Sequence, residues 1–215
     1  MDDDQFDAAL LSMAMTQAEA VGWHRVTVAD AAREAGLTLD KARARFPTRN
    51  RILSKLGLLA DQAALVDEGS TGTTRERLFD MLMRRFDVLQ QYRGGVQSVL
   101  RALPLDPALA LMLGAKTQAS MAWMAQAAGL DTSGIAGSLR VSGLVAVWLQ
   151  ALRGWDRDDS PDLSGTMVAL DRALDRAASF GRYLGGNSPL HGPEPVPDLD
   201  EPGEPFMPEP EPPIV

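Results

Sequence analysis

The chain has 215 residues, 45% of them hydrophobic, and a formal net charge of −8, a composition ordinary for a soluble globular protein long enough to bury a core. It contains no cysteine and only two histidines, which excludes disulfides and thiolate metal sites and argues against a histidine-rich metal centre or a Ser-His-Asp triad. The acidic N-terminus lacks the basic segment of a secretory signal, and the apolar run at 141–152 is too short to span a bilayer. We expect a cytoplasmic protein with no cofactor, no metal ion and no integral membrane association.

The negative charge is concentrated at the C-terminal end. Residues 184–215 contain seven Asp or Glu and no Lys or Arg, so the net charge of −8 falls to −1 when they are left out. The acidic balance therefore does not argue against an anionic partner for the rest of the chain. This segment is rich in proline and poor in apolar residues, and we predict a disordered acidic tail.

A helix-turn-helix is predicted between residues 27 and 46. Residues 5–21 have apolar side chains at helical spacing and form a helix in front of it. Thr27 and Thr38 are typical N-caps of two short helices. Gly36 between them can adopt the left-handed backbone angles of a tight turn. Two helices joined in this way are the pattern of a DNA-binding helix-turn-helix.

Dense positive charge accompanies the second helix of this pattern. Six basic residues fall within fifteen positions, and no Asp or Glu occurs from 41 to 60: Lys41, Arg43, Arg45, Arg49, Arg51 and Lys55. Ala42 and Phe46, one turn apart, would face the core, which leaves the basic side chains free to reach phosphates and base edges. Thr48 would cap a fourth helix that runs to about residue 66. A solvated basic face without a ligand is the alternative interpretation.

Residues 5–60 resemble the N-terminal domain of the TetR family of bacterial transcriptional regulators. The resemblance is carried by the Gly-Trp pair after the first helix and by the stretches TVADAAREAG and LTLDKARARFPTRNRIL. Arg43 and Arg45 stand where the family has an aromatic pair, the following Phe-Pro is kept, and Arg49 takes the position of a lysine. The resemblance implies that seven residues face DNA: Thr27, Thr38, Leu39, Lys41, Arg43, Arg45 and Arg49.

The second part of the chain is predicted to be helical throughout. A Gly/Ser/Thr-rich linker at 67–73 separates it from the first part. Helices are expected at 74–92, 96–103, 108–128, 139–155 and 163–183, with breaks at Gly94-Gly95 and at prolines. No strand pattern of any length is present. We predict an all-α, TetR-like fold of about nine helices: a three-helix DNA-binding domain with its connecting helix (1–66), a helical ligand-binding and dimerisation domain (74–183), and the tail (184–215).

The leading hypothesis is a TetR-type transcriptional regulator, with repression as the expected mode. The helix at 139–155 is apolar on most faces, as helices at interfaces are, and it would form a homodimer together with the helix at 163–183. Two recognition helices would then enter successive major grooves of a double-stranded DNA operator. The expected effector is an apolar small molecule held by five residues, each of which is also typical of ordinary core: Phe86, Met112, Met121, Trp123 and Trp148.

A second resemblance supplies the alternative. Residues 120–183 resemble the C-terminal part of COQ9, a ubiquinone-biosynthesis accessory protein whose own fold is TetR-like. The residues that carry it are Trp123, Ala128-Gly129, Thr132, Arg140, Asp159-Ser160-Pro161-Asp162, Thr166 and Leu170-Asp171-Arg172. It implies a lipid-binding protein that kept the fold and lost DNA binding. An enzyme is not expected, because the acidic turn at 156–162 has no His, Cys or glycine-rich phosphate loop beside it.

Overall fold

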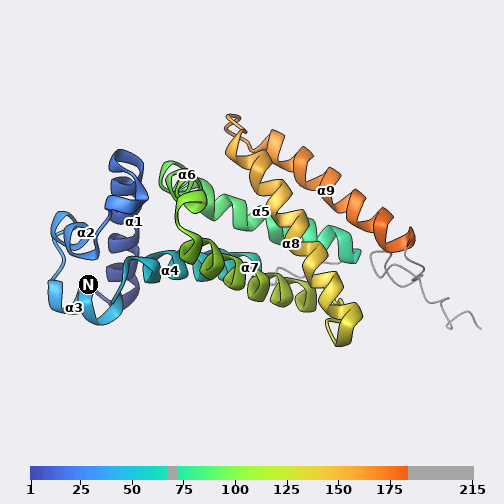
Figure 1. Ribbon diagram of the computed structural model, residues 1–215, viewed down its shortest axis with the longest axis horizontal. Coiled ribbons are helices and arrows are strands. Elements are labelled where there is room, and N and C mark those ends of the chain that lie inside the picture. The colour runs from blue at the N-terminus through green and yellow to red at the C-terminus, as the bar shows by residue number, and fades with distance from the viewer. Residues whose placement is uncertain (67–71, 184–215) are drawn as a thin grey trace, which may run out of the picture.

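The computed structural model describes residues 1–66 and 72–183 (Figure 1). Within these two ranges the chain forms nine α-helices and two 3-10 helices, and no strand. The predicted all-α fold of about nine helices is therefore confirmed. The predicted tail and most of the predicted linker lie outside the described residues.

Four α-helices and one 3-10 helix make up the first part: α1 (Asp3–Val21), η1 (Trp23–Arg25), α2 (Val28–Glu34), α3 (Leu39–Arg45) and α4 (Arg49–Ala64). The predicted cap of α2 is present, because the Thr27 hydroxyl oxygen accepts a hydrogen bond of 3.1 Å from the Asp30 amide. Gly36 has a φ of 67°, which suits the turn between α2 and α3. Thr38 and Thr48 occupy the N-cap positions of α3 and α4, but their side chains make no capping hydrogen bond.

The second part consists of α5 (Thr74–Gln90), α6 (Arg93–Ala102), η2 (Leu103–Leu105), α7 (Pro107–Ala127), α8 (Gly134–Asp156) and α9 (Ser164–Tyr183). The break predicted at Gly94-Gly95 is present but lies at 91–92, between α5 and α6, and both glycines belong to the first turn of α6. Gly95 instead allows close packing: a Cβ there would lie 2.7 Å from the carbonyl oxygen of Met15 in α1. The glycine therefore brings two helix backbones together and does not end a helix.

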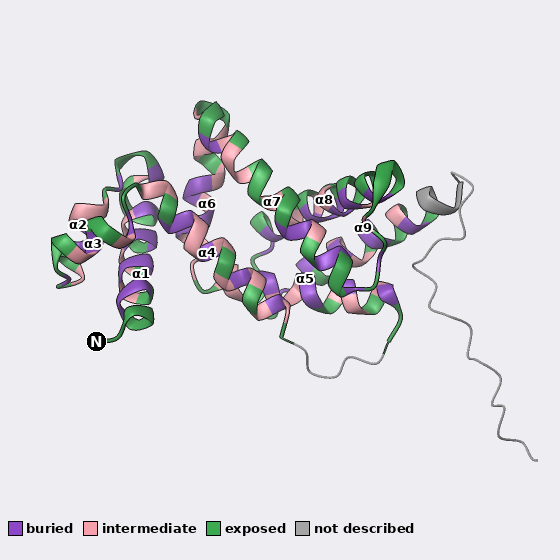
Figure 2. Cartoon of the chain, turned by 90° about the horizontal axis from the view of Figure 1, so that it is seen from below, coloured by how far each residue is buried: buried purple, intermediate pink, exposed green. Residues whose placement is uncertain are grey.

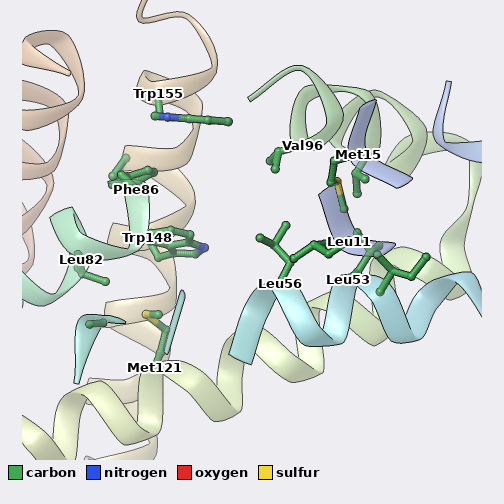
Figure 3. Close-up of a cluster of buried hydrophobic side chains, with 14 of the residues drawn as sticks. Leu11, Met15, Leu53, Leu56, Leu82, Phe86, Val96, Met121, Trp148 and Trp155 are labelled. Carbon is green, nitrogen blue, oxygen red and sulfur yellow. The ribbon is translucent and has the colours of Figure 1, made fainter. Parts of the chain in front are cut away.

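One continuous hydrophobic core joins the two parts of the chain. Figure 3 shows its two regions, one around Leu11 and Met15 of α1 and Leu56 of α4, the other around Phe86 of α5 and Trp148 of α8. The rings of Phe86 and Trp148 stack with their centroids 4.6 Å apart. The helix-turn-helix lies at one end of the molecule, α9 lies toward the other, and α4 leads from the first into the body (Figure 1).

Helix α8 has the length and composition of a membrane-crossing helix, with 23 residues and a mean hydropathy of 1.5 over its most apolar window. The apolar run judged too short from the sequence lies inside this longer helix. Length and composition are weak evidence, because the core helix of a soluble protein has the same properties. Here α8 packs against α7 and α9 and contributes Trp148 and Trp155 to the core.

Candidate nucleic-acid interface

Helix α3 is anchored by a narrow apolar stripe. Ala42 and Phe46 are 1% and 3% exposed, which confirms the prediction that these two face the core. Four of the seven residues predicted to face DNA are exposed, and the other three, all cationic, are half-buried. The exposed ones are Thr27, Thr38, Leu39 and Arg43; the half-buried ones are Lys41, Arg45 and Arg49. This burial follows from ion pairs and hydrogen bonds that the sequence analysis did not foresee.

The N-terminal turns of α1 supply the carboxylates for these ion pairs. The Arg45 guanidinium donates in a fork to both oxygens of Asp7, with an Nη2–Oδ2 distance of 2.7 Å. Asp7 also accepts Lys55 Nζ at 3.0 Å, and Asp3 pairs with both Lys41 and Arg45 at 2.7 Å. The hydrogen bond from Arg45, helped by Lys55, holds the pKa of Asp7 below its usual range despite its burial. The same contact raises the pKa of Arg45.

The other two arginines predicted to face DNA, Arg43 and Arg49, donate hydrogen bonds to backbone carbonyl oxygens. Arg43 Nη1 donates to the Pro47 carbonyl oxygen at 2.7 Å. Arg49 Nη1 donates to the His24 carbonyl oxygen at 2.7 Å, and its guanidinium lies 6.0 Å from the ring centroid of Trp23. Each guanidinium has further N–H donors for a phosphate. Both arginines are thus held in place by the protein itself, which would reduce the ordering that binding of a phosphate requires.

The five predicted ligand-binding residues are only partly together. Phe86, Met121 and Trp148 are buried in one cluster (Figure 3), and Met112 is half-buried against the core. Trp123 is 65% exposed on the outer face of α7, so it does not join the cluster. The structure therefore brings three of the five side chains together.

A buried polar network beside this cluster was not found by the sequence analysis. Arg85 of α5 is 6% exposed and pairs with Asp61 of α4, which also accepts the Ser120 hydroxyl of α7 at 2.6 Å. The Arg85 guanidinium lies 4.7 Å from the Trp148 ring centroid. Burial lowers the pKa of Arg85 to about 10, which leaves it charged at neutral pH. The network joins α4, α5 and α7 at one point.

Two surface cavities border the helix-turn-helix. The first, of about 630 Å³, is called here the basic cleft, and its lining includes Asp7, Arg45, Arg51, Lys55, Leu58 and Lys116. The second, of about 540 Å³, lies between the first helices and α6 and is lined by Trp23, Arg49 and Arg101 among others. Neither is lined by any of the five predicted ligand-binding residues.

The acidic turn between α8 and α9 has a structural role. Asp158 accepts the amide and hydroxyl of Thr166 at 2.6 and 2.7 Å and the hydroxyl of Ser160 at 2.5 Å. Burial alone would raise the pKa of Asp158, but the hydrogen bonds from Ser160 and Thr166 hold it at about 2. Asp171, further along α9, pairs with Arg75 of α5 at 2.7 Å. Several residues of the COQ9 resemblance thus tie α9 to α8 and α5.

Comparison with solved structures finds the same fold in transcriptional regulators. A TetR transcriptional regulator from Nitrosomonas europaea superposes with a TM-score of 0.67 at 22% identity, over 82% of this chain and 99% of that one. A tetR-family transcriptional regulator from Streptomyces coelicolor gives 0.58 at 17% identity, over 86% and 87%. GusR of Salmonella enterica gives 0.56 at 17% identity, over 82% and 97%. No protein-family model and no curated protein sequence matches the chain. At these identities the likeness establishes a TetR-like fold.

Proposed function

We propose that this protein is a DNA-binding transcriptional regulator of the TetR type, acting as a repressor in the cytoplasm. The observation that carries the proposal is the geometry of α2 and α3. A short recognition helix is anchored by Ala42 and Phe46, and Thr38, Leu39 and Arg43 lie exposed around it. Such a helix can enter a major groove while arginine and amide donors contact the phosphates.

The proposed regulator is a homodimer that pairs through α8 and α9. Apolar side chains remain exposed on these two helices: Leu139, Leu149, Met167 and Val168 are 36–64% exposed. Figure 2 shows exposed stretches along α8 and α9. An exposed apolar surface of this kind is typical of an interface. A two-fold dimer would place its recognition helices roughly 34–36 Å apart, one turn of DNA.

The proposed effector is an apolar small molecule that inserts beside Phe86, Met121 and Trp148. These side chains present aromatic and sulfur surface between α5, α7 and α8. The adjacent pairing of Arg85 with Asp61 links that region to α4, the helix that leads to the recognition helix. A ligand that moved α5 or α7 would therefore act on α4, and it would shift the dimer between two states to the extent that it binds one better.

The test is selection of DNA fragments from the protein's own genome at two salt concentrations, about 50 and 200 mM. We expect enrichment of a short palindrome and an affinity that falls steeply with salt. Arg43→Glu should abolish the enrichment. It should also reduce the slope of log affinity against log salt concentration by about one per monomer. Arg157→Glu, an exposed site at the end of α8, is the matched control and should bind like wild type. Unchanged operator affinity and slope in Arg43→Glu would refute the role assigned to α3.

A lipid-binding accessory protein of the COQ9 type is the competing proposal. It is favoured by the carboxylates of α1, because Asp3 and Asp7 form ion pairs with basic side chains that would otherwise be free to contact phosphates. It predicts weak DNA binding without sequence preference and a co-purified polyprenyl or quinone-like lipid. An organic extract of purified protein without such a lipid would exclude it.

A further inference from the structure

The basic cleft opens on the side of the helix-turn-helix that faces the body. Its walls come from the end of α3, from α4 and, across the cleft, from Lys116 of α7. Figure 1 shows α7 running across α4, and these two helices are in contact. Its volume of about 630 Å³ is within the range of small-molecule sites.

Positive charge dominates the lining, with four cations and one carboxylate. Asp7 is engaged by Arg45 and Lys55, and Asp3 and Asp4 reach the same two cations from outside the lining. Arg51 and Lys116 are exposed. Across residues 1–66 and 72–183, no ion pair or hydrogen bond involves either side chain.

Like charges on one concave surface repel one another, and a bound anion would relieve the repulsion. The geometry points to a binding site for a small multivalent anion of the phosphate type, bridging Arg51 and Lys55 of α4 to Lys116 of α7. A guanidinium can bind a phosphate group through two parallel hydrogen bonds, and a lysine adds a point charge. Leu58 in the same lining is 50% exposed and gives an organic phosphate apolar surface for its carbon atoms.

The site spans two parts of the molecule that a regulator would move relative to each other. Arg51 and Lys55 lie on the half of α4 next to the recognition helix, whereas Lys116 belongs to the body. A bridging anion would fix the recognition helix relative to α7 and so change operator affinity, a consequence that rests on the proposed function. Binding of the anion itself does not depend on that function.

Pyrophosphate is the probe, titrated by calorimetry into the full-length protein without DNA at constant ionic strength. We expect saturable binding that weakens roughly tenfold in Lys116→Gln and in Arg51→Gln, the effect of losing one charged hydrogen bond. Arg157→Gln removes the same charge at a remote exposed site and should bind like wild type. Absence of saturable binding, or an equal loss in Arg157→Gln, would overturn the site.

The phosphate groups could also be those of DNA, and the same variants separate the two sources. If the ligand is a free anion, Lys116→Gln loses pyrophosphate affinity and keeps wild-type affinity for DNA measured without pyrophosphate. If Lys116→Gln instead weakens DNA binding and wild type does not bind pyrophosphate, the cleft holds DNA backbone and the small-molecule assignment is wrong. The proposed function fails by a different result: Arg43→Glu would then bind the operator with the same affinity and salt dependence as wild type. That result does not affect the pyrophosphate measurements.

Discussion

Asp7→Asn tests whether the carboxylate of α1 holds the helix-turn-helix in place. The Asp7 side chain is 6% exposed and accepts two hydrogen bonds from Arg45 and a third from Lys55. The side chains of Arg45 and Lys55 are 29% and 21% exposed. Asparagine keeps the size of the side chain but removes the charge that balances two cations. Removing one partner of a buried ion pair, which leaves the other charge uncompensated, costs about 3–5 kcal/mol. Both cations retain some solvent and Arg45 retains Asp3, so we expect unfolding free energy to fall by about 1–3 kcal/mol at pH 7.

Urea unfolding followed by circular dichroism measures this difference, with the denaturant slope checked for constancy. Asp4→Asn is the matched control, because Asp4 is 95% exposed and lies 3.6 Å from Lys55; it should change stability by less than about 0.5 kcal/mol.

The stabilisation by Asp7 also depends on pH. The pKa of Asp7 is lowered in the folded protein, so its contribution to the unfolding free energy is complete above the unfolded pKa of about 3.9 and is lost as pH falls through the lower folded value. The gap between wild type and Asp7→Asn should therefore narrow below about pH 4. Equal urea midpoints at pH 7 would refute the reasoning.

Two further predictions concern packing and assembly. Gly95→Ala would place a Cβ 2.7 Å from the Met15 carbonyl oxygen and should lower the unfolding free energy by about 1–3 kcal/mol. Gly114→Ala in α7, where a Cβ would have nothing within 4 Å, is the control and should be neutral or stabilising by up to about 1 kcal/mol. Thermal unfolding of both variants measures the difference, and equal stabilities would contradict the close packing of Gly95. Val168→Asp on α9 should convert the proposed dimer to a monomer in light scattering, while Val21→Asp, at a similarly exposed valine of α1, should leave the mass unchanged; a Val168→Asp dimer would rule out pairing through this face.

The parts of the fold that could be predicted are those specified by neighbouring residues. The cap at Thr27, the turn at Gly36 and the stripe of Ala42 and Phe46 each depend on a few consecutive positions, and the structure contains all three. The break between α5 and α6 was predicted at Gly94-Gly95, because a glycine pair is a local signal of a break, whereas it lies at 91–92. The requirement that places Gly95 there is contact with Met15 in another helix, which local propensity does not report.

The candidate site was harder to predict because its electrostatics are long-range. Asp7 and Arg45 lie 38 residues apart, and only the folded arrangement of α1 against α3 and α4 brings them together. The spacing of Asp3 and Asp7, one helical turn apart, was an available sign of an acidic face on α1. No such sign existed for the ligand-binding residues. The same apolar residue types occur in a core, in a pocket and on an exposed face such as the one where Trp123 lies.

Helix α7 connects the two binding regions that we propose. Lys116 borders the basic cleft, and one turn later Ser120 donates to Asp61. Asp61 in turn pairs with Arg85, which lies over the ring of Trp148. An anion in the basic cleft and an apolar molecule beside Trp148 would thus act on the same pair of helices, α4 and α7. Because each ligand would select among the same relative positions of these helices, binding of one must alter the affinity for the other, by an equal factor in both directions.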